Sequence, residues 1–129
     1  MKPLFSIFIL SFVLNFIWEN LHSFLYTNYM GGKITETILL RASIVDALII
    51  TAISLPFIYF AIFGKKDWAI IFIGFFISIT IELYALNTGR WSYNQYMPLM
   101  PLLPVGLTPT IQLGFLGYLS FRLVAKKKK

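Results

Sequence analysis

Three acidic residues stand inside long apolar stretches of the sequence, namely Glu19, Asp46 and Glu82. An ionised side chain at the centre of a membrane-spanning helix costs about 2.5–3.5 kcal/mol on insertion scales, so an acid in such a place is expected to serve a function. A carboxyl group that donates a proton, beside a group that accepts one, is what general acid–base catalysis needs. We predict that Glu19, Asp46 and Glu82, together with His22, are the catalytic residues.

Polar residues around Glu19 recur at intervals of four, three and four residues, in the order Asn15, Glu19, His22 and Tyr26. This spacing puts them on one stripe of a helix. Counted at 1.5 Å per residue from the outer helix ends, the three acids and His22 lie roughly 5–17 Å below the outer surface. We therefore expect them to converge on one pocket in the outer leaflet. The residues predicted to bind a substrate there are Asn15, Trp18, Tyr26, Arg41, Trp91, Tyr93 and Gln112.

Simpler interpretations of the same residues stay open. In the first of them, Glu19 and His22 form a hydrogen-bonded pair whose role is only to hold helices together. Glu82, near a helix end, would reach the membrane interface, and the tryptophans would be interface anchors. The acids and His22 would also make an oxygen-rich metal site, but with one His and no Cys the spacing does not demand one. We predict neither a metal nor another cofactor.

Composition places these residues in a membrane. Of the 129 residues, 58% are hydrophobic and 12% are charged, and the mean hydropathy is +0.78. A soluble fold of this size buries only about 60–70% of the surface that its unfolded chain exposes, which is too little to hide so many apolar side chains. The lack of cysteine excludes a disulfide-stapled module and a thiolate-ligated metal domain. We predict an all-α, polytopic membrane protein.

Four stretches are long and apolar enough to cross a bilayer, which takes about 20 residues as a helix. The predicted helices are 3–26, 35–63, 67–86 and 109–125, followed by a basic cytoplasmic tail, 126–129. Together they form one domain, a bundle of four transmembrane helices. The alternative for the first stretch, a cleaved secretory signal, lacks a small-residue cleavage site. Pro56 predicts a kink in the second helix, and Gly74, Ser78 and Ala85 predict a close approach of the third helix to a neighbour.

Basic residues predict the orientation. Eight of the 11 Lys and Arg residues lie on the side of the membrane that holds both termini: Lys2, Lys65, Lys66, Arg122 and Lys126 to Lys129. Because cytoplasmic loops are enriched in Lys and Arg, we predict a plasma (inner) membrane protein with both termini in the cytoplasm. The four-lysine tail indicates contact with anionic membrane lipids. We predict no nucleic-acid partner, because no nucleic-acid-binding fold surrounds these charges.

The connection before the last helix, residues 89–109, is rich in proline. Three prolines at three-residue spacing stand between apolar residues: Pro98, Pro101 and Pro104. This spacing favours an extended, polyproline-like segment at the extracytoplasmic interface, anchored by neighbouring aromatic residues, and we expect it to cover the outer mouth of the bundle. Those aromatic residues are Trp91, Tyr93 and Tyr96. Thr108 is predicted to be the N-cap of the last helix, with Pro109 as its first residue.

Five features of the sequence are noteworthy in combination: Trp18-Glu19-x-x-His22-x-x-Leu25-Tyr26, Asp46 in the second span, Trp91-x-Tyr93, Met97-Pro98-x-x-Pro101 and Gly106-Leu107-x-Pro109-x-x-Gln112. With these motifs the chain resembles a family of small, uncharacterised bacterial membrane proteins. The resemblance covers nearly the whole chain and implies a four-span topology with no known activity. That family tends to carry Gln at the position of His22 and Gly at that of Val45.

Glu82, followed by Thr88-Gly89-Arg90-Trp91-x-Tyr93, carries a second similarity that covers about a tenth of the chain. It is similar to membrane enzymes of carotenoid and isoprenoid metabolism and to sterol-isomerase-like domains. The resemblance implies that an intramembrane acid protonates an alkene, and that Trp and Tyr rings stabilise the cation that results. Aromatic faces are physically suited to that role.

Three functions remain open. The first is acid–base chemistry of the isomerase, cyclase or hydratase type on a lipid or isoprenoid-like hydrophobic small molecule. The second is a small, homo-oligomeric transporter coupled to protons or ions, and the third is a non-catalytic membrane subunit. The predicted cytoplasmic halves of the helices carry few polar residues beyond Ser6 and Ser11. Because this one-sided polarity favours a pocket over a conduit, we predict the first function.

Overall fold

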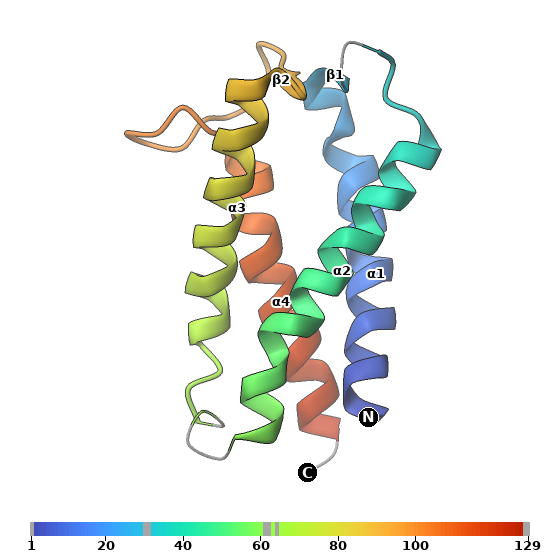
Figure 1. Cartoon of the computed structure of the whole chain (residues 1–129), viewed down its shortest axis with the longest axis vertical. Coiled ribbons are helices and arrows are strands. Elements are labelled where there is room, and N and C mark those ends of the chain that lie inside the picture. Colours follow the sequence, from blue (N-terminus) through green and yellow to red (C-terminus); the bar gives the residue numbers. More distant parts are fainter. Residues whose placement is uncertain (1, 30–31, 61–62, 64, 128–129) are drawn as a thin grey trace.

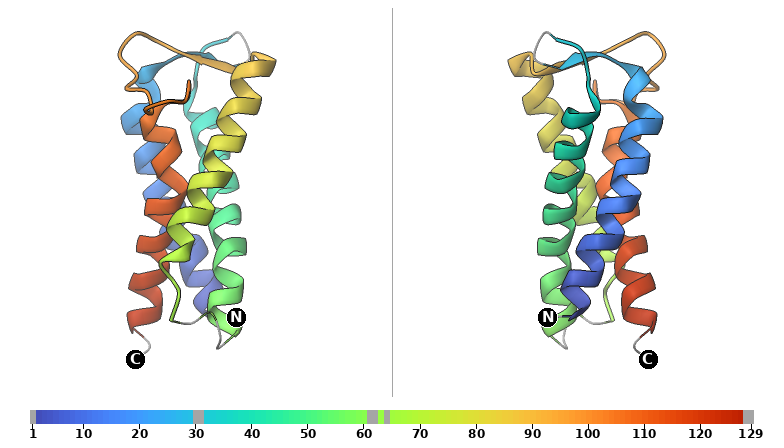
Figure 2. Two further views of the ribbon diagram at one scale, coloured as in Figure 1. Left: turned by 90° about the vertical axis from the view of Figure 1, so that its left-hand side faces the viewer. Right: turned by 90° about the vertical axis from the view of Figure 1, so that its right-hand side faces the viewer.

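The structure, a computed structural model, describes residues 2–29, 32–60, 63 and 65–127. It is mostly helical, as predicted. The helices are α1 (Lys2–His22), α2 (Glu36–Tyr59), α3 (Ala69–Thr88) and α4 (Leu107–Lys127), with the short 3₁₀ helix η1 (Ser23–Leu25) after α1. The four long helices lie side by side (Figure 1). Two short strands, β1 (Tyr26–Tyr29) and β2 (Trp91–Tyr93), lie at one end of the bundle, and α1 begins and α4 ends at the other (Figure 2).

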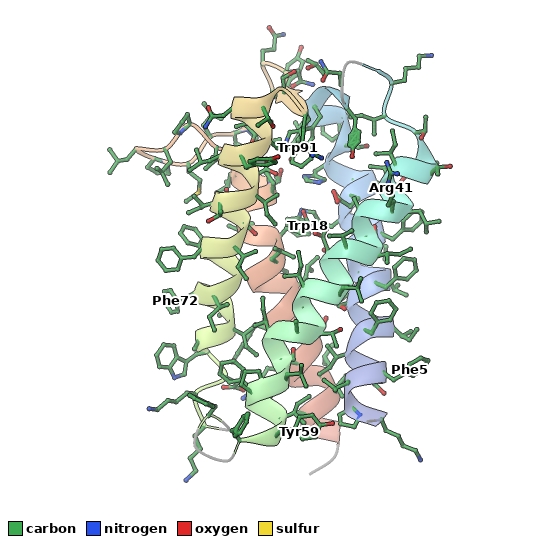
Figure 3. All side chains as sticks on the ribbon, viewed as in Figure 1. Phe5, Trp18, Arg41, Tyr59, Phe72 and Trp91 are labelled. Atoms are coloured by element: carbon green, nitrogen blue, oxygen red, sulfur yellow. The ribbon has the colours of Figure 1, made fainter. Side chains whose placement is uncertain are left out.

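Three helical segments are long and apolar enough to cross a membrane: Lys2–Leu25, Glu36–Tyr59 and Ala69–Thr88. Their outward faces carry large apolar side chains, of which Phe5 on α1 and Phe72 on α3 are labelled in Figure 3. Water would make such a surface prone to aggregation, whereas lipid solvates it. α4 does not reach the same hydropathy over the residues described.

α3 and α4 approach so closely that their backbones touch. A Cβ atom added to Gly74 would lie 2.4 Å from the backbone nitrogen of Gly114, and one added to Gly114 would lie 2.4 Å from the carbonyl oxygen of Ile71. Gly74, Ser78 and Ala85 are all buried on this side of α3. The predicted close approach through small residues is therefore confirmed, and its partner is Gly114 of α4.

The helices pack as two pairs. α1 packs along α2, and α3 packs along α4, whereas α2 and α3 share few contacts and diverge toward the strand end of the bundle (Figure 1). α4 also contacts α1 and α2. The buried apolar core lies between the four helices and includes Ile7, Ile50 and Ile70. Pro56 lies in the last turn of α2, which ends at Tyr59 rather than at the predicted residue 63.

The first helix ends at His22, four residues before its predicted end. Tyr26 instead begins β1, which pairs with β2 in antiparallel fashion so that Tyr26 lies opposite Tyr93 and Tyr29 opposite Trp91. The backbone amide and carbonyl groups of β1 find their hydrogen-bond partners in β2 instead of in a continued helix. The spacing of polar residues along the first helix could not reveal this pairing, because the two strands are far apart in sequence. The prediction of Tyr26 on a helix is wrong. Its side chain nevertheless turns toward the same interior, as described below.

Residues 98–104 do not form an extended polyproline-like segment. The amide of Met100 donates to the carbonyl of Val105, and that of Leu107 donates to the carbonyl of Pro98, so the chain doubles back. Leu102 lies at the tip with a positive φ of 70°. Proline fixes φ and removes its own amide, but it leaves the neighbouring groups free to close a turn. This loop projects sideways beyond α3 instead of covering the end of the bundle, over which the two strands lie (Figure 1).

Candidate functional site

A cavity of about 300 Å³ lies near the strand end of the bundle, among all four long helices and both strands. All four residues predicted as catalytic line it: Glu19, His22, Asp46 and Glu82. Four of the residues predicted to bind a substrate also line it, namely Tyr26, Arg41, Trp91 and Gln112. Figure 3 shows Trp91 and Arg41 near that end of the bundle, with Arg41 on α2. The structure thus brings residues from six separate helices and strands to one place.

Glu19 and His22 lie one helical turn apart and are hydrogen-bonded. The Nε2 atom of His22 is 2.7 Å from Oε1 of Glu19, and its Nδ1 atom is 2.9 Å from the hydroxyl oxygen of Thr108. Thr108 therefore contacts the site from α4. The prediction that it caps that helix is wrong, because α4 begins at Leu107 and the amide of Thr110 bonds to Gly106 instead. His22 links two helices and orients the Glu19 carboxyl group.

Gln112 connects three helices at the base of the cavity. Its amide nitrogen donates to Oδ1 of Asn15 at 2.8 Å and to Oδ2 of Asp46 at 3.0 Å. The carboxyl groups of Asp46 on α2 and Glu19 on α1 both line the cavity. When one of two such carboxyl groups holds a proton and the other is ionised, the pair supplies an acid and a base. Asp46 and Arg41 both lie on α2, and they form no ion pair with each other among the described residues.

Glu82 faces the Glu19–Asp46 pair from α3 and is only 5% exposed, so it does not reach the membrane interface as its simpler interpretation required. Three donors converge on its Oε1 atom: the hydroxyl groups of Tyr26 and Tyr93 and the indole nitrogen of Trp91. The Tyr93 hydroxyl group in turn accepts from the amide of Gly106 at 2.9 Å. The strand pair thus positions these three aromatic side chains, of which the sequence had suggested Trp91 and Tyr93 as interface anchors and Tyr26 as a substrate-binding residue.

Burial and the nearby Glu82 carboxyl group raise the pKa of Tyr26 well above its ordinary value of 10.0 and likewise raise the pKa of Tyr93. Both phenols therefore remain hydrogen-bond donors to Glu82 in the folded protein. Because the unfolded chain releases these protons at lower pH, the folded state loses stability as the pH rises above about 10.

This pKa shift gives a titration experiment. We expect the Tyr26→Phe/Tyr93→Phe variant to show the same phenolate absorbance as the wild type near pH 10, and less only at higher pH or after unfolding. The measurement is a spectrophotometric titration of both proteins in detergent micelles. A smaller phenolate signal in the variant near pH 10 would show that these two phenols titrate normally.

Three predicted substrate-binding residues lie outside the cavity lining. Asn15 sits behind it, bonded to Gln112. Trp18 packs against Phe115, with ring centroids 6.3 Å apart, and touches His22 edge-on. Tyr93 acts through Glu82 and Gly106. These residues support the cavity wall and do not form part of its surface.

The sequence did not single out Thr108, Tyr29 or Ser78 as site residues. Tyr29 lines the cavity because β1 turns it back toward Trp91, and short strand pairing leaves no clear signal in an apolar sequence. Ser78 lies one turn before Glu82 on the buried face of α3, where the spacing identified a small residue for packing. No group of three or more His, Cys, Asp or Glu side chains in the described part of the chain is arranged to hold a metal ion.

Comparisons of this chain with protein-family models, with curated proteins and with solved structures found no match.

Proposed function

We propose that this is a four-span protein of the plasma membrane that binds the polar end of a lipid or isoprenoid-like amphiphile in the cavity and exchanges protons with it. One observation carries the proposal: four titratable side chains, Glu19, His22, Asp46 and Glu82, line a single cavity inside a bundle with an apolar surface. Ionisable groups in such surroundings are costly and mark functional sites.

The position of the cavity supports entry from the lipid. Arg41 and Val45 of α2 line it and are also exposed, and Ile81 of α3 lines it and is partly exposed. The cavity therefore reaches the surface between α2 and α3, where the two helices diverge. The exposed faces of membrane-spanning helices contact acyl chains, so this mouth opens sideways toward lipid.

The size of the cavity limits what it holds. A volume of about 300 Å³ is at the lower end for small-molecule sites and equals the liquid volume of about ten waters. A polar head of about that many atoms fits, while a long hydrocarbon tail has to remain between the helices and the surrounding lipid. An amphiphile that enters head first satisfies both conditions.

The arrangement suits proton transfer. The Glu19–Asp46 pair and Glu82 face the same space from different helices. Glu82 uses Oε1 for all of its described hydrogen bonds, which leaves Oε2 for a ligand. One carboxyl group can protonate the ligand while another removes a proton, as in an isomerase, cyclase or hydratase reaction.

The four-span topology needs α4 to cross the membrane as well. α4 has 21 residues, about 32 Å at 1.5 Å per residue, which matches a hydrocarbon core of about 30 Å. Its lower hydropathy fits a helix that contacts all three others, because such a helix exposes less surface to lipid. Both termini would then lie on the basic, cytoplasmic side.

A transporter is less well supported. Toward the other end of the bundle the interior is mostly packed apolar side chains, including Ile7, Ile50 and Ile70, each 0% exposed. A path for ions or protons needs polar groups or water along its length. Among the described residues, the buried ionisable side chains lie at the strand end, and the other end offers only the serine hydroxyl groups of Ser11, Ser54 and Ser120.

Native mass spectrometry of the gently purified protein, combined with lipid extraction, tests the proposal. We expect the wild type to retain a defined amphiphile and the Glu19→Gln/Asp46→Asn/Glu82→Gln variant to lose it. The matched control is Glu36→Gln, which removes an exposed acid in the first turn of α2 that is not among the residues lining the cavity. Circular dichroism establishes that each variant is folded. Retention of the same amphiphile by the folded triple variant would contradict the proposal.

A further inference from the structure

We infer that the ligand of this cavity carries a primary ammonium group, which binds between the carboxyl groups and the aromatic side chains at the strand end. The inference deepens the proposed function and rests on it. Three features of the cavity support it independently: its balance of charges, its aromatic wall and a buried hydroxyl group without a partner.

The cavity contains more acid than base. Three carboxyl groups line it, and the Lys and Arg residues contribute only Arg41, which is exposed at the mouth. The two ion pairs among the described residues join Glu19 to His22 and Asp67 to Arg122, so neither Asp46 nor Glu82 has a cationic partner there. A carboxylate withdrawn from water is costly unless it is paired with a cation and hydrogen-bonded. A ligand ammonium group would supply that cation.

Aromatic rings form one wall of the cavity beside Glu82. Tyr26, Tyr29 and Trp91 line it. The Tyr29 ring stacks on Trp91 with centroids 6.1 Å apart, and the Tyr26 ring stands at 80° to Trp91. The faces of aromatic rings attract cations. The wall and the Glu82 carboxyl group therefore favour the same ligand charge.

The Ser78 hydroxyl group can accept a hydrogen bond from an N–H donor of the ligand. It lines the cavity and is 3% exposed, and its hydroxyl oxygen has no hydrogen-bond partner among the described residues. It lies one helical turn from Glu82, on the same buried face of α3. A buried hydroxyl group without a partner is unfavourable. A primary ammonium group has three N–H donors, enough for Ser78, Glu82 and a third acceptor, whereas a quaternary ammonium group has none.

The mouth suits a negative group attached to the same ligand. The Arg41 guanidinium group lines the mouth and has no ion-pair partner in the described part of the chain. Guanidinium groups bind phosphate with two hydrogen bonds. An aminoalkyl phosphate head would place its ammonium group at Glu82 and its phosphate at Arg41. A long-chain amine shares the ammonium group but lacks the phosphate.

The test uses the full-length protein in nanodiscs of phosphatidylglycerol, doped in turn with phosphatidylethanolamine, its N-acetylated derivative, phosphatidylcholine or dodecylamine. Retained lipid is measured by native mass spectrometry. We expect phosphatidylethanolamine to be enriched at least about tenfold over the N-acetylated lipid and over phosphatidylcholine. Displacement of it by dodecylamine assigns recognition to the ammonium group alone, and failure of dodecylamine to displace it assigns recognition to the whole head.

Variants connect this preference to the cavity. Ser78→Ala and Glu82→Gln should each reduce the enrichment of phosphatidylethanolamine at least about fivefold, and Glu36→Gln should leave it unchanged. Equal retention of the amine and N-acetylated lipids overturns the inference. If the N-acetylated lipid is retained as well as the amine lipid, and the Ala42→Trp substitution, which fills the cavity from α2, abolishes its retention, the cavity binds an amphiphile without recognising an ammonium group. The proposed function then stands and the present inference fails. If no amphiphile is retained at all, both fail.

Discussion

Replacement of Gly114 by alanine is expected to separate α3 from α4 and to destabilise the protein by at least about 1–3 kcal/mol, the usual range for overpacked interiors. The added Cβ atom would lie 2.4 Å from the carbonyl oxygen of Ile71. Real atoms do not approach so closely, and a backbone oxygen cannot rotate away as a side chain can. The two helices would have to move apart, which would shift Ser78 and Glu82 on α3 relative to Gln112 on α4.

Gly117 provides a matched control on the same helix. A Cβ atom there would lie 3.4 Å from side-chain atoms of Ile50 and Ile70, an ordinary contact. Gly117→Ala is therefore expected to be nearly neutral. Thermal unfolding in a mild detergent, followed by circular dichroism, measures both variants. Equal stability of the two variants would contradict the close backbone contact between α3 and α4.

Replacement of Gln112 by leucine is expected to have the second large effect. The amide nitrogen of Gln112 is the described donor to both Asn15 and Asp46, so the change leaves two buried oxygen atoms without it. Each loss costs about 1–3 kcal/mol in water-soluble proteins and about 0.6–2 kcal/mol between membrane helices. We expect lower stability and weaker retention of the cavity ligand, because Asp46 loses the group that orients it.

A double-mutant cycle separates this effect from simple repacking. Asn15→Leu removes the acceptor on α1, and the Asn15→Leu/Gln112→Leu variant removes both partners. If the hydrogen bond matters, the double variant should be more stable than the sum of the two single changes predicts. The free energy of unfolding in detergent gives the coupling. Strict additivity would show that the Asn15–Gln112 bond contributes nothing.

Local spacing predicted the parts of the site that lie on single helices. Glu19 and His22, three residues apart, are hydrogen-bonded. The positions of Glu19, Asp46 and Glu82 along their helices were enough to predict that the three acids lie at a similar depth, and all three line the same cavity. Gly74 and Ser78 lie on the buried face of α3, as their period required. These features depend on helical geometry alone, which is fixed at 3.6 residues per turn.

Contacts between segments that are far apart in the sequence could not be predicted from it. The donors to Glu82 depend on β1 and β2, which are far apart in sequence and too short for an alternating pattern to stand out. Gln112 was expected at the site, but its simultaneous bonds to Asn15 and Asp46 depend on the way three helices pack. The prediction for the proline-rich connection was wrong because proline spacing favours extended backbone locally, while the hydrogen bonds from Met100 to Val105 and from Leu107 to Pro98 fold the chain back on itself.

The central claim is that the cavity opens sideways to lipid between α2 and α3. Tryptophan fluorescence tests it directly, because Trp91 lines the cavity. The Trp18→Phe/Trp68→Phe variant, which keeps Trp91 as its single tryptophan, is placed in vesicles whose acyl chains carry bromine near the glycerol backbone. We predict strong quenching by the brominated lipid and weaker quenching once Ala42→Phe narrows the mouth. Quenching by aqueous acrylamide alone, with none by the brominated lipid, would contradict the claim.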